Sequence, residues 1–147
     1  MNSRIRQPHT RPWHFMVVGI LSLLWNGFGA FDYLATKLRW SPYMANFSDT
    51  QLAYFNTVPL WQEIAWAVGI WGAVLGSIGL ILARRWSVAL FALSLIGMLA
   101  SFSTVFWLEQ ARAATEESGW AFTAAIVVVG VLLLAYSRKR AQQGQLT

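Results

Sequence analysis

Four long runs of apolar residues dominate the chain, and each run contains no Asp, Glu, Lys or Arg. The uncharged runs are 13–31, 64–83, 86–108 and 118–137, with 19 to 23 residues each. An α-helix rises about 1.5 Å per residue, so a run of about 20 residues spans roughly 30 Å, the thickness of the hydrocarbon core of a bilayer. Helices are favoured there because the backbone must satisfy its own hydrogen bonds in lipid. The pattern predicts an all-α, integral membrane four-helix bundle forming one domain over 1–147, with spans at about 13–35, 61–83, 86–108 and 118–137.

The composition supports a membrane protein rather than a soluble one. Of the 147 residues, 56% are hydrophobic and only 12% are charged, whereas a soluble domain usually has about twice that charged fraction. The chain has no cysteine, which excludes disulfides, thiolate metal sites and cysteine nucleophiles.

The charged residues predict the orientation of the spans. Eight basic residues and no acid lie in the two tails and in the link at 84–85, whereas three basic and six acidic residues lie toward the opposite side of the membrane. Basic residues mark cytoplasmic loops, so we expect both termini in the cytoplasm. The membrane topology thus explains the basic residues behind the net charge of +5. We therefore expect no nucleic-acid partner. The basic residues on the expected cytoplasmic side are Arg4, Arg6, Arg11, Arg84, Arg85, Arg138, Lys139 and Arg140.

The first apolar run follows a basic leader, as the core of a signal peptide does. Cleavage after Ala30 would place Phe28 where a small residue is preferred, and the run is long for a signal. We therefore expect an uncleaved first helix.

Tryptophans flank the predicted spans. Indole rings prefer the level of the lipid headgroups, so the flanking rings support these boundaries. Three other tryptophans, Trp25, Trp66 and Trp71, lie deeper, and we expect them to pack inside the bundle. The flanking residues are Trp13, Trp40, Trp61, Trp86, Trp107 and Trp120.

The outer loop at 36–60 contains a helix-start signal. Ser48 and Gln51 have the spacing of a capping box, and Asp49 suits the positive end of a helix dipole. The pattern favours a short helix that ends at Pro59 and lies on the outer membrane surface or over the mouth of the bundle. A simple ordered connector is the alternative. The second outer loop, 109–119, is acidic and short. Because the link at 84–85 is very tight, we expect the second and third spans to form an antiparallel hairpin.

Polar residues inside the first span recur at steps of three and four, so they share one helix face. Buried polar groups are costly in lipid, and this face should turn into the bundle or toward a water-filled cavity. For Asn26, a ligand site and a structural interhelical hydrogen bond are both open. Asp32 either belongs to a ligand or proton site or forms an ion pair with Lys37 or Arg39 at the membrane interface. The residues of this face are Ser22, Trp25, Asn26, Gly29, Asp32 and Tyr33.

Glu63 is predicted at the depth of Asp32. Two carboxylates that open on one outward-facing pocket can bind a cation or share a proton. The alternative is that both are hydrated and paired with nearby bases.

Small residues form faces on the second and third spans, including a GxxxG pattern at Gly72 and Gly76. Such faces let helices approach closely, and the partner of the second span can be the first span or a second copy of the chain. The candidate helix-packing residues are Gly69, Gly72, Gly76, Ser94, Gly97 and Ser101.

The residues needed for several kinds of chemistry are missing. His9 and His14 are the only histidines, so a bis-histidine haem within one chain is not expected. The sequence has no HExxH motif, nucleotide-binding glycine loop or serine-nucleophile elbow. We expect a protein that is not an enzyme and that has no cofactor and no metal site.

Several segments resemble a family of small four-span bacterial inner-membrane proteins, some of which carry the label "sugar transporter". The resemblance covers roughly residues 12–140 and implies a location in the bacterial inner membrane, but no catalytic residues. The segments that carry it are Trp25–Tyr33, Tyr43-Met44, Gln51–Phe55, Pro59 with Trp61, and Val74–Ser77.

Two functions remain open at this stage. The first is a small transporter or permease-like protein with an outward-facing pocket for a sugar-like or other small polar solute, acting as a homodimer through its glycine face. The second is a non-catalytic accessory subunit or assembly factor of a larger membrane complex. The candidate ligand-binding residues are Trp25, Asn26, Asp32, Tyr33 and Glu63.

Overall fold

The computed structural model describes residues 13–147, without the side chains of residues 117 and 118. The arginines at 4, 6 and 11, His9 and the side chain of Glu117 therefore lie outside the described part. Every regular element within 13–147 is helical, as predicted. The elements are α1 (Trp13–Lys37), α2 (Ser41–Met44), α3 (Asp49–Thr57), α4 (Leu60–Ile81), α5 (Trp86–Phe102), the 3-10 helix η1 (Ser103–Phe106), α6 (Glu109–Ser118) and α7 (Trp120–Gln142).

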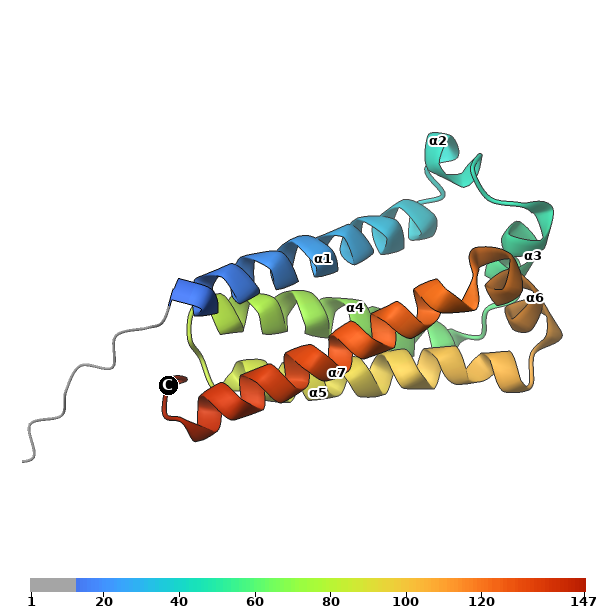
Figure 1. Cartoon of the computed structure of the whole chain (residues 1–147). Coiled ribbons are helices and arrows are strands. Elements are labelled where there is room, and N and C mark those ends of the chain that lie inside the picture. The colour runs from blue at the N-terminus through green and yellow to red at the C-terminus, as the bar shows by residue number, and fades with distance from the viewer. Residues whose placement is uncertain (1–12) are drawn as a thin grey trace, which may run out of the picture.

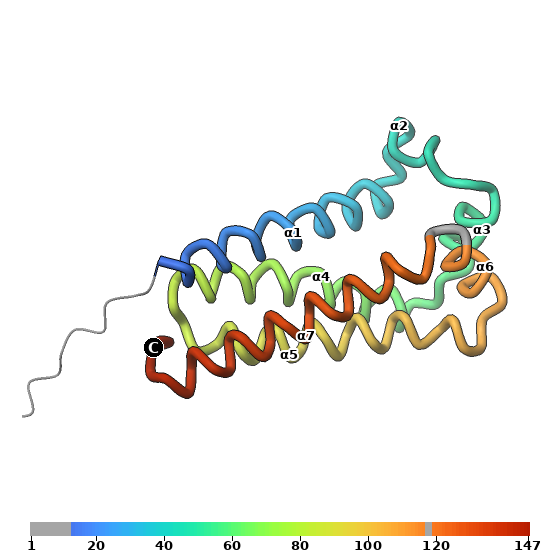
Figure 2. Tube along the Cα trace, in the orientation of Figure 1, coloured from blue at the N-terminus to red at the C-terminus, as the bar shows by residue number. Residues whose placement is uncertain are grey.

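Four helices are long and apolar enough to cross a membrane: α1, α4, α5 continued by η1, and α7. The predicted spans are recovered with shifted ends, because the third ends in a 3-10 turn at Phe106 and the fourth runs on to Gln142. The long helices run alternately up and down, and both described ends of the chain lie at one end of the bundle (Figures 1 and 2). We call this the terminal end, and the opposite end, where α2, α3 and α6 lie, the loop end.

Helices α4 and α5 form the antiparallel hairpin expected from the tight link at 84–85. They approach closely because glycines face each other: a Cβ on Gly97 would lie 2.7 Å from the carbonyl oxygen of Ala65. Ser94 donates a hydrogen bond to the carbonyl of Gly69 (2.6 Å), and Gly72 also faces Ser94. The partner of the glycine face is thus α5 of the same chain, and not the first span or a second copy. The expected dimer through this face is incompatible with that packing.

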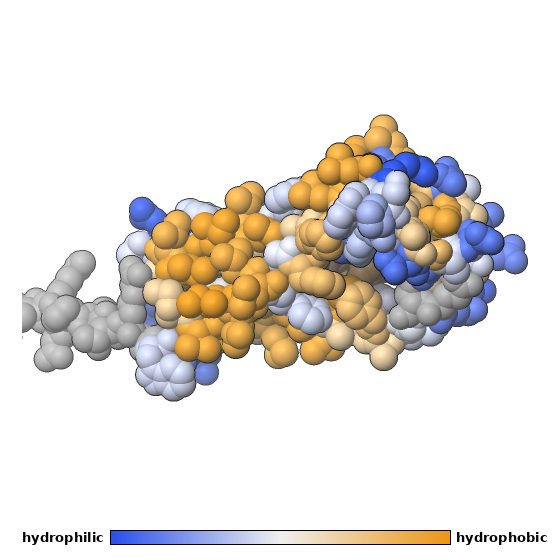
Figure 3. All heavy atoms as spheres, turned by 90° about the horizontal axis from the view of Figure 1, so that it is seen from above, coloured by the Kyte–Doolittle hydropathy of each residue, from blue (hydrophilic) through white to orange (hydrophobic). Residues whose placement is uncertain are grey.

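Burial in the bundle is the inverse of that in a soluble protein. Many of the buried residues are small or hydroxyl-bearing, whereas large aliphatic and aromatic side chains are exposed along all four long helices. Figure 3 shows an extensive apolar surface over the helices, with hydrophilic residues gathered chiefly at the loop end. The six flanking tryptophans are all exposed. Such a surface suits contact with acyl chains, and the protein is a multi-pass membrane protein by this criterion.

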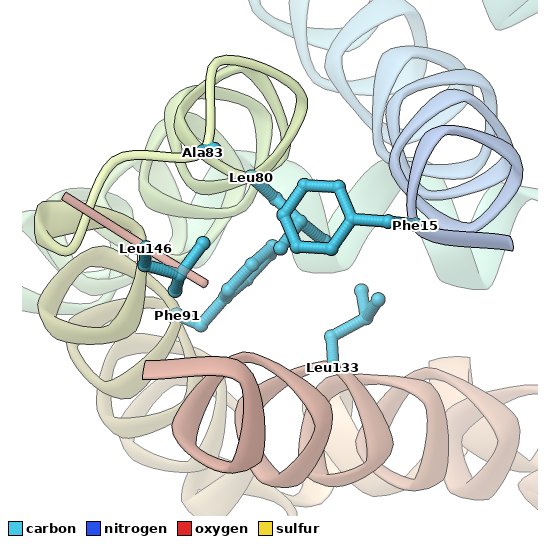
Figure 4. Packing of buried hydrophobic residues seen from close by; sticks show 6 residues of the cluster. All are labelled: Phe15, Leu80, Ala83, Phe91, Leu133 and Leu146. Atoms are coloured by element: carbon cyan, nitrogen blue, oxygen red, sulfur yellow. The ribbon is translucent and has the colours of Figure 1, made fainter. Parts of the chain in front are cut away.

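The terminal end of the bundle is closed by an apolar cluster. Phe15 of α1, Leu80 of α4, Phe91 of α5 and Leu133 of α7 converge between the four long helices (Figure 4). Leu146 from the carboxyl-terminal segment joins them and is 3% exposed.

The carboxyl-terminal segment is held against the α4–α5 link by main-chain hydrogen bonds. The amide of Thr147 donates to the carbonyl of Ala83, and the amide of Arg85 donates to Thr147, both at 2.8 Å. These bonds place Leu146 in the apolar cluster.

Three short helices cover the loop end. The capping box predicted at Ser48 and Gln51 is present at the start of α3, and α3 packs on α6 across the end of the bundle. The short acidic loop at 109–119 forms a helix, α6, which buries Ala111 and Ala114 and which the sequence pattern did not indicate. Helix α2, with Pro42 in its first turn, was also not anticipated. Gly119, with φ of +88°, lets the chain turn from α6 into α7.

Candidate functional site

A cavity of about 510 Å³ occupies the loop-end half of the bundle. All four long helices contribute to its walls, and α2, α3 and α6 close it at the loop end. The apolar cluster at Phe15 and Leu133 lies beyond its other limit. Aromatic side chains form much of the wall: Trp25, Phe28, Tyr43, Phe47, Tyr54, Phe55, Trp66, Phe102 and Phe122.

Exposed aromatic residues from α1 and α7 mark where the cavity reaches the surface. Trp25 and Phe28 of α1 are 41% and 64% exposed, and Phe122 of α7 is 52% exposed, although all three line the cavity. Helix α1 packs chiefly on α4, and α7 chiefly on α5, and α1 diverges from α4 toward the loop end (Figure 1). The cavity therefore opens between α1 and α7, on a side where the surface is apolar. Trp25 is at this opening, and Trp71 is 39% exposed, so the expectation that both pack inside the bundle is wrong.

Asp32 of α1 faces Tyr43 of α2 across the cavity wall. The hydroxyl of Tyr43 donates a hydrogen bond to Oδ1 of Asp32, which ties the loop back onto the first long helix. Burial raises the pKa of the Tyr43 phenol above its ordinary value, and the hydrogen bond to Asp32 and the negative charge of that residue raise it further. Tyr43 therefore remains a hydrogen-bond donor at neutral pH.

Asp32 is not paired with the bases that the sequence offered. Lys37 forms an ion pair with Glu63 (2.6 Å), and Arg39 donates to Asn56 (2.5 Å). Among the described residues that line the cavity, Asp32 is the only Asp, Glu, Lys or Arg.

Gln62 of α4 lies in the cavity wall and is 3% exposed. Its Nε2 donates to the hydroxyls of Tyr54 and Thr104. Thr104 uses its own proton on the carbonyl of Ser101 (2.8 Å), so it must accept from Gln62, which fixes the orientation of the amide. Oε1 of Gln62 is consequently left buried and has no hydrogen-bond partner in the described part of the chain. A buried acceptor without a partner is costly.

Asn26 lies at the inner limit of the cavity and joins α1 to α4. Its Nδ2 donates to Oγ of Ser77 (2.9 Å). Ser77 donates its proton to the carbonyl of Ala73 (2.8 Å), so the contact of 2.5 Å between Ser22 and Ser77 makes Ser22 the donor. Asn26 therefore makes the interhelical hydrogen bond that was one of its two interpretations, while it also contributes to the cavity wall.

Two of the five predicted ligand-binding residues lie outside the cavity. Glu63 lines a separate cavity of about 60 Å³ with Lys37, so it does not share a pocket with Asp32. Tyr33 packs edge-on against Trp66, with ring centroids 4.7 Å apart. Its position next to Asp32 in a helix places it about 100° around the axis, and thus toward α4 rather than the cavity.

The structure adds site residues that the sequence did not single out. Tyr43 and Tyr54 come from the short helices, and Thr104 comes from the end of the third span. Ser101, expected only as a packing residue, also lines the cavity. The capping box gave a signal that α3 is ordered, but nothing in the sequence showed which face of it would be turned inward.

The site offers no ligand set for a metal ion. Within residues 13–147, no three His, Asp or Glu side chains are grouped closely enough to hold one. A comparison of the chain with protein-family models, curated proteins and solved structures found no match.

Proposed function

We propose that this multi-pass membrane protein binds a small amphipathic molecule in the loop-end cavity, as a permease-like solute-binding protein. The observation that supports this most strongly is the cavity itself, about 510 Å³ of space lined by aromatic rings and a few polar groups. Ligand sites are typically concave, largely apolar and supplied with a small number of polar groups that orient the ligand.

The composition of the walls favours a ligand with an apolar body. The cavity wall has many more aromatic and aliphatic side chains than polar ones, which suits an amphipathic solute better than a free sugar. The opening between Trp25, Phe28 and Phe122 faces the apolar side of the bundle, so the ligand reaches the site from the bilayer. The cluster around Phe15 and Leu133 closes the other half, and passage through the bundle would require that cluster to separate.

We also propose that the protein lies in the bacterial inner membrane with both termini in the cytoplasm. The described basic residues at 84–85 and 138–140 lie at the terminal end, whereas the described acidic residues lie in α1, α3, α4 and α6 toward the loop end. Basic residues favour the cytoplasmic side, which places the loop end and its cavity on the outer side. Reporter fusions at the carboxyl terminus test this orientation, and an outside location of that terminus would contradict it.

Filling the cavity tests the binding function. In Gly29→Leu the new side chain would occupy the cavity wall, and its Cβ would meet only Ile70 at an ordinary 3.4 Å. Gly27→Leu is the matched control, because a Cβ there meets nothing within 4 Å and Gly27 is outside the cavity wall. Calorimetric titration of the protein in phosphatidylcholine nanodiscs with benzyl glucoside, methyl glucoside, tetraphenylphosphonium and triphenylphosphine oxide should show at least one saturable ligand. Gly29→Leu should abolish that binding and Gly27→Leu should retain it.

One observation favours the second candidate, an accessory subunit of a larger membrane complex. Helix α7 packs chiefly on α5 and exposes a broad aliphatic face that includes Val128, Val131 and Leu132. Purification in a mild detergent distinguishes the two functions. A stoichiometric partner chain, together with no saturable ligand in the titration, would favour the accessory role.

A further inference from the structure

We infer that the cavity selects a hydrophobic organic cation, such as a substituted ammonium or phosphonium ion, and that Asp32 is the residue that recognises its charge. This inference rests on the proposed binding function and narrows it to one class of ligand.

The first argument is that Asp32 has no basic partner among the described residues. The described bases nearest in sequence are engaged elsewhere, Lys37 with Glu63 and Arg39 with Asn56. Tyr43 donates to Oδ1 of Asp32, and the hydrogen bonds found in the described part of the chain leave Oδ2 available. A carboxylate in an apolar, membrane-embedded wall is costly unless it is neutralised. A cation in the cavity would supply the missing partner.

The second argument is the aromatic wall. Trp25, Trp66 and Phe122 line the same cavity as Asp32, together with six further aromatic residues. The faces of aromatic rings attract cations, most strongly where water is excluded, and Trp is the most effective of them. An anion would meet both the carboxylate and the negative ring faces, so the site disfavours it.

The third argument concerns the kind of cation. Small inorganic cations need several oxygen ligands to replace their hydration shell, and the cavity offers one carboxylate. A bulky organic cation is weakly hydrated and fills apolar space. Gln62 also lies in the cavity wall, and its Oε1 has no hydrogen-bond partner in the described part of the chain.

Titration with probes of matched shape and different charge tests the inference. The protein in phosphatidylcholine nanodiscs is titrated with tetraphenylphosphonium, its anionic counterpart tetraphenylborate, and neutral triphenylphosphine oxide, with empty nanodiscs subtracted. We expect the cation to bind at least about tenfold more tightly than the neutral probe, corresponding to one charge contact in a partly desolvated site. Asp32→Asn should weaken cation binding by about tenfold or more and leave neutral binding unchanged.

Two further variants guard against misfolding and nonspecific charge effects. Asp32→Glu keeps the carboxylate and should retain part of the cation preference. Asp49→Asn removes a carboxylate from the exposed first turn of α3, outside the cavity wall, and should bind as the unmodified protein does.

The possible outcomes separate this inference from the proposed function. Equal binding of cation and neutral probe, with Asp32→Asn affecting neither, would overturn the charge selectivity and leave the binding function standing. If the unmodified protein binds no probe more than Gly29→Leu does, both would be overturned.

Discussion

Tyr43 donates its phenolic hydrogen to the carboxylate of Asp32, and this contact links the loop-end helix α2 to the middle of the candidate site. Asp32 thereby gains one hydrogen bond at Oδ1. The loop is thus not only a cover for the bundle, because it helps to position the charged group of the site.

The raised pKa of Tyr43 predicts a stability change at alkaline pH. Its pKa is higher in the folded protein than in the unfolded chain, so the corresponding stability is fully present below about pH 10 and is lost as the pH rises through the folded-state value. An absorbance titration at 295 nm should show one phenol that ionises later than the ordinary range. Tyr43→Phe should remove this late phase, and its persistence in that variant would contradict the assignment.

The close approach of α4 and α5 predicts opposite outcomes for two glycine substitutions. In Gly97→Ala the new Cβ would lie 2.7 Å from the main-chain oxygen of Ala65 and 2.8 Å from the amide nitrogen of Gly69. Since backbone atoms cannot move aside easily, we expect the free energy of unfolding to fall by about 2 kcal/mol or more. Gly27→Ala meets nothing within 4 Å and should be neutral or stabilise by about 0.5–1 kcal/mol. Thermal unfolding in detergent measures both, and similar effects of the two would refute this packing.

The carboxyl-terminal segment predicts a stability role for Leu146. Its side chain is 3% exposed among Leu80, Phe91 and the other cluster residues. Leu146→Ala should lower the free energy of unfolding by about 2–3 kcal/mol, because the cluster loses apolar contact and a cavity remains. Leu132→Ala is the comparison, since Leu132 is 62% exposed and would lose only contact with lipid or detergent. Denaturation in detergent should show a clearly lower stability for Leu146→Ala, and equal stabilities would show that the segment does not dock.

The ion pair between Lys37 and Glu63 should contribute little to the stability of the protein. Both side chains are about one-third exposed, at 36% and 33%, so solvent screens the attraction and we expect it to contribute less than about 1 kcal/mol. Glu63→Gln should lower the stability within that bound and leave probe binding unchanged, because Glu63 is outside the large cavity. A strong loss of tetraphenylphosphonium binding in Glu63→Gln would place Glu63 in the site after all.

The sequence predicted that a polar face of the first span contributes to the site, but not which residues belong to the site. The face formed by Asn26 and Asp32 was recognised from its three- and four-residue spacing, and the structure places both residues in the cavity wall. Tyr33 fits that spacing only loosely. It directly follows Asp32, so its side chain points about 100° away around the helix axis, and it packs against Trp66. The expected pairing of Asp32 with Lys37 or Arg39 failed because those bases reach Glu63 and Asn56 instead.

The sequence alone determined the number of long helices, the hairpin at 84–85 and the capped start of α3. These features depend on local properties: the length of an apolar run, the shortness of a link and the spacing of a capping box. Tertiary structure decided that the glycine face packs on α5, that α6 packs against α3, and that the four long helices leave a cavity in the loop-end half of the bundle. The physical reason is that every long helix has more than one apolar or small-residue face, and only close packing between particular helices determines which face is buried and which lines a cavity.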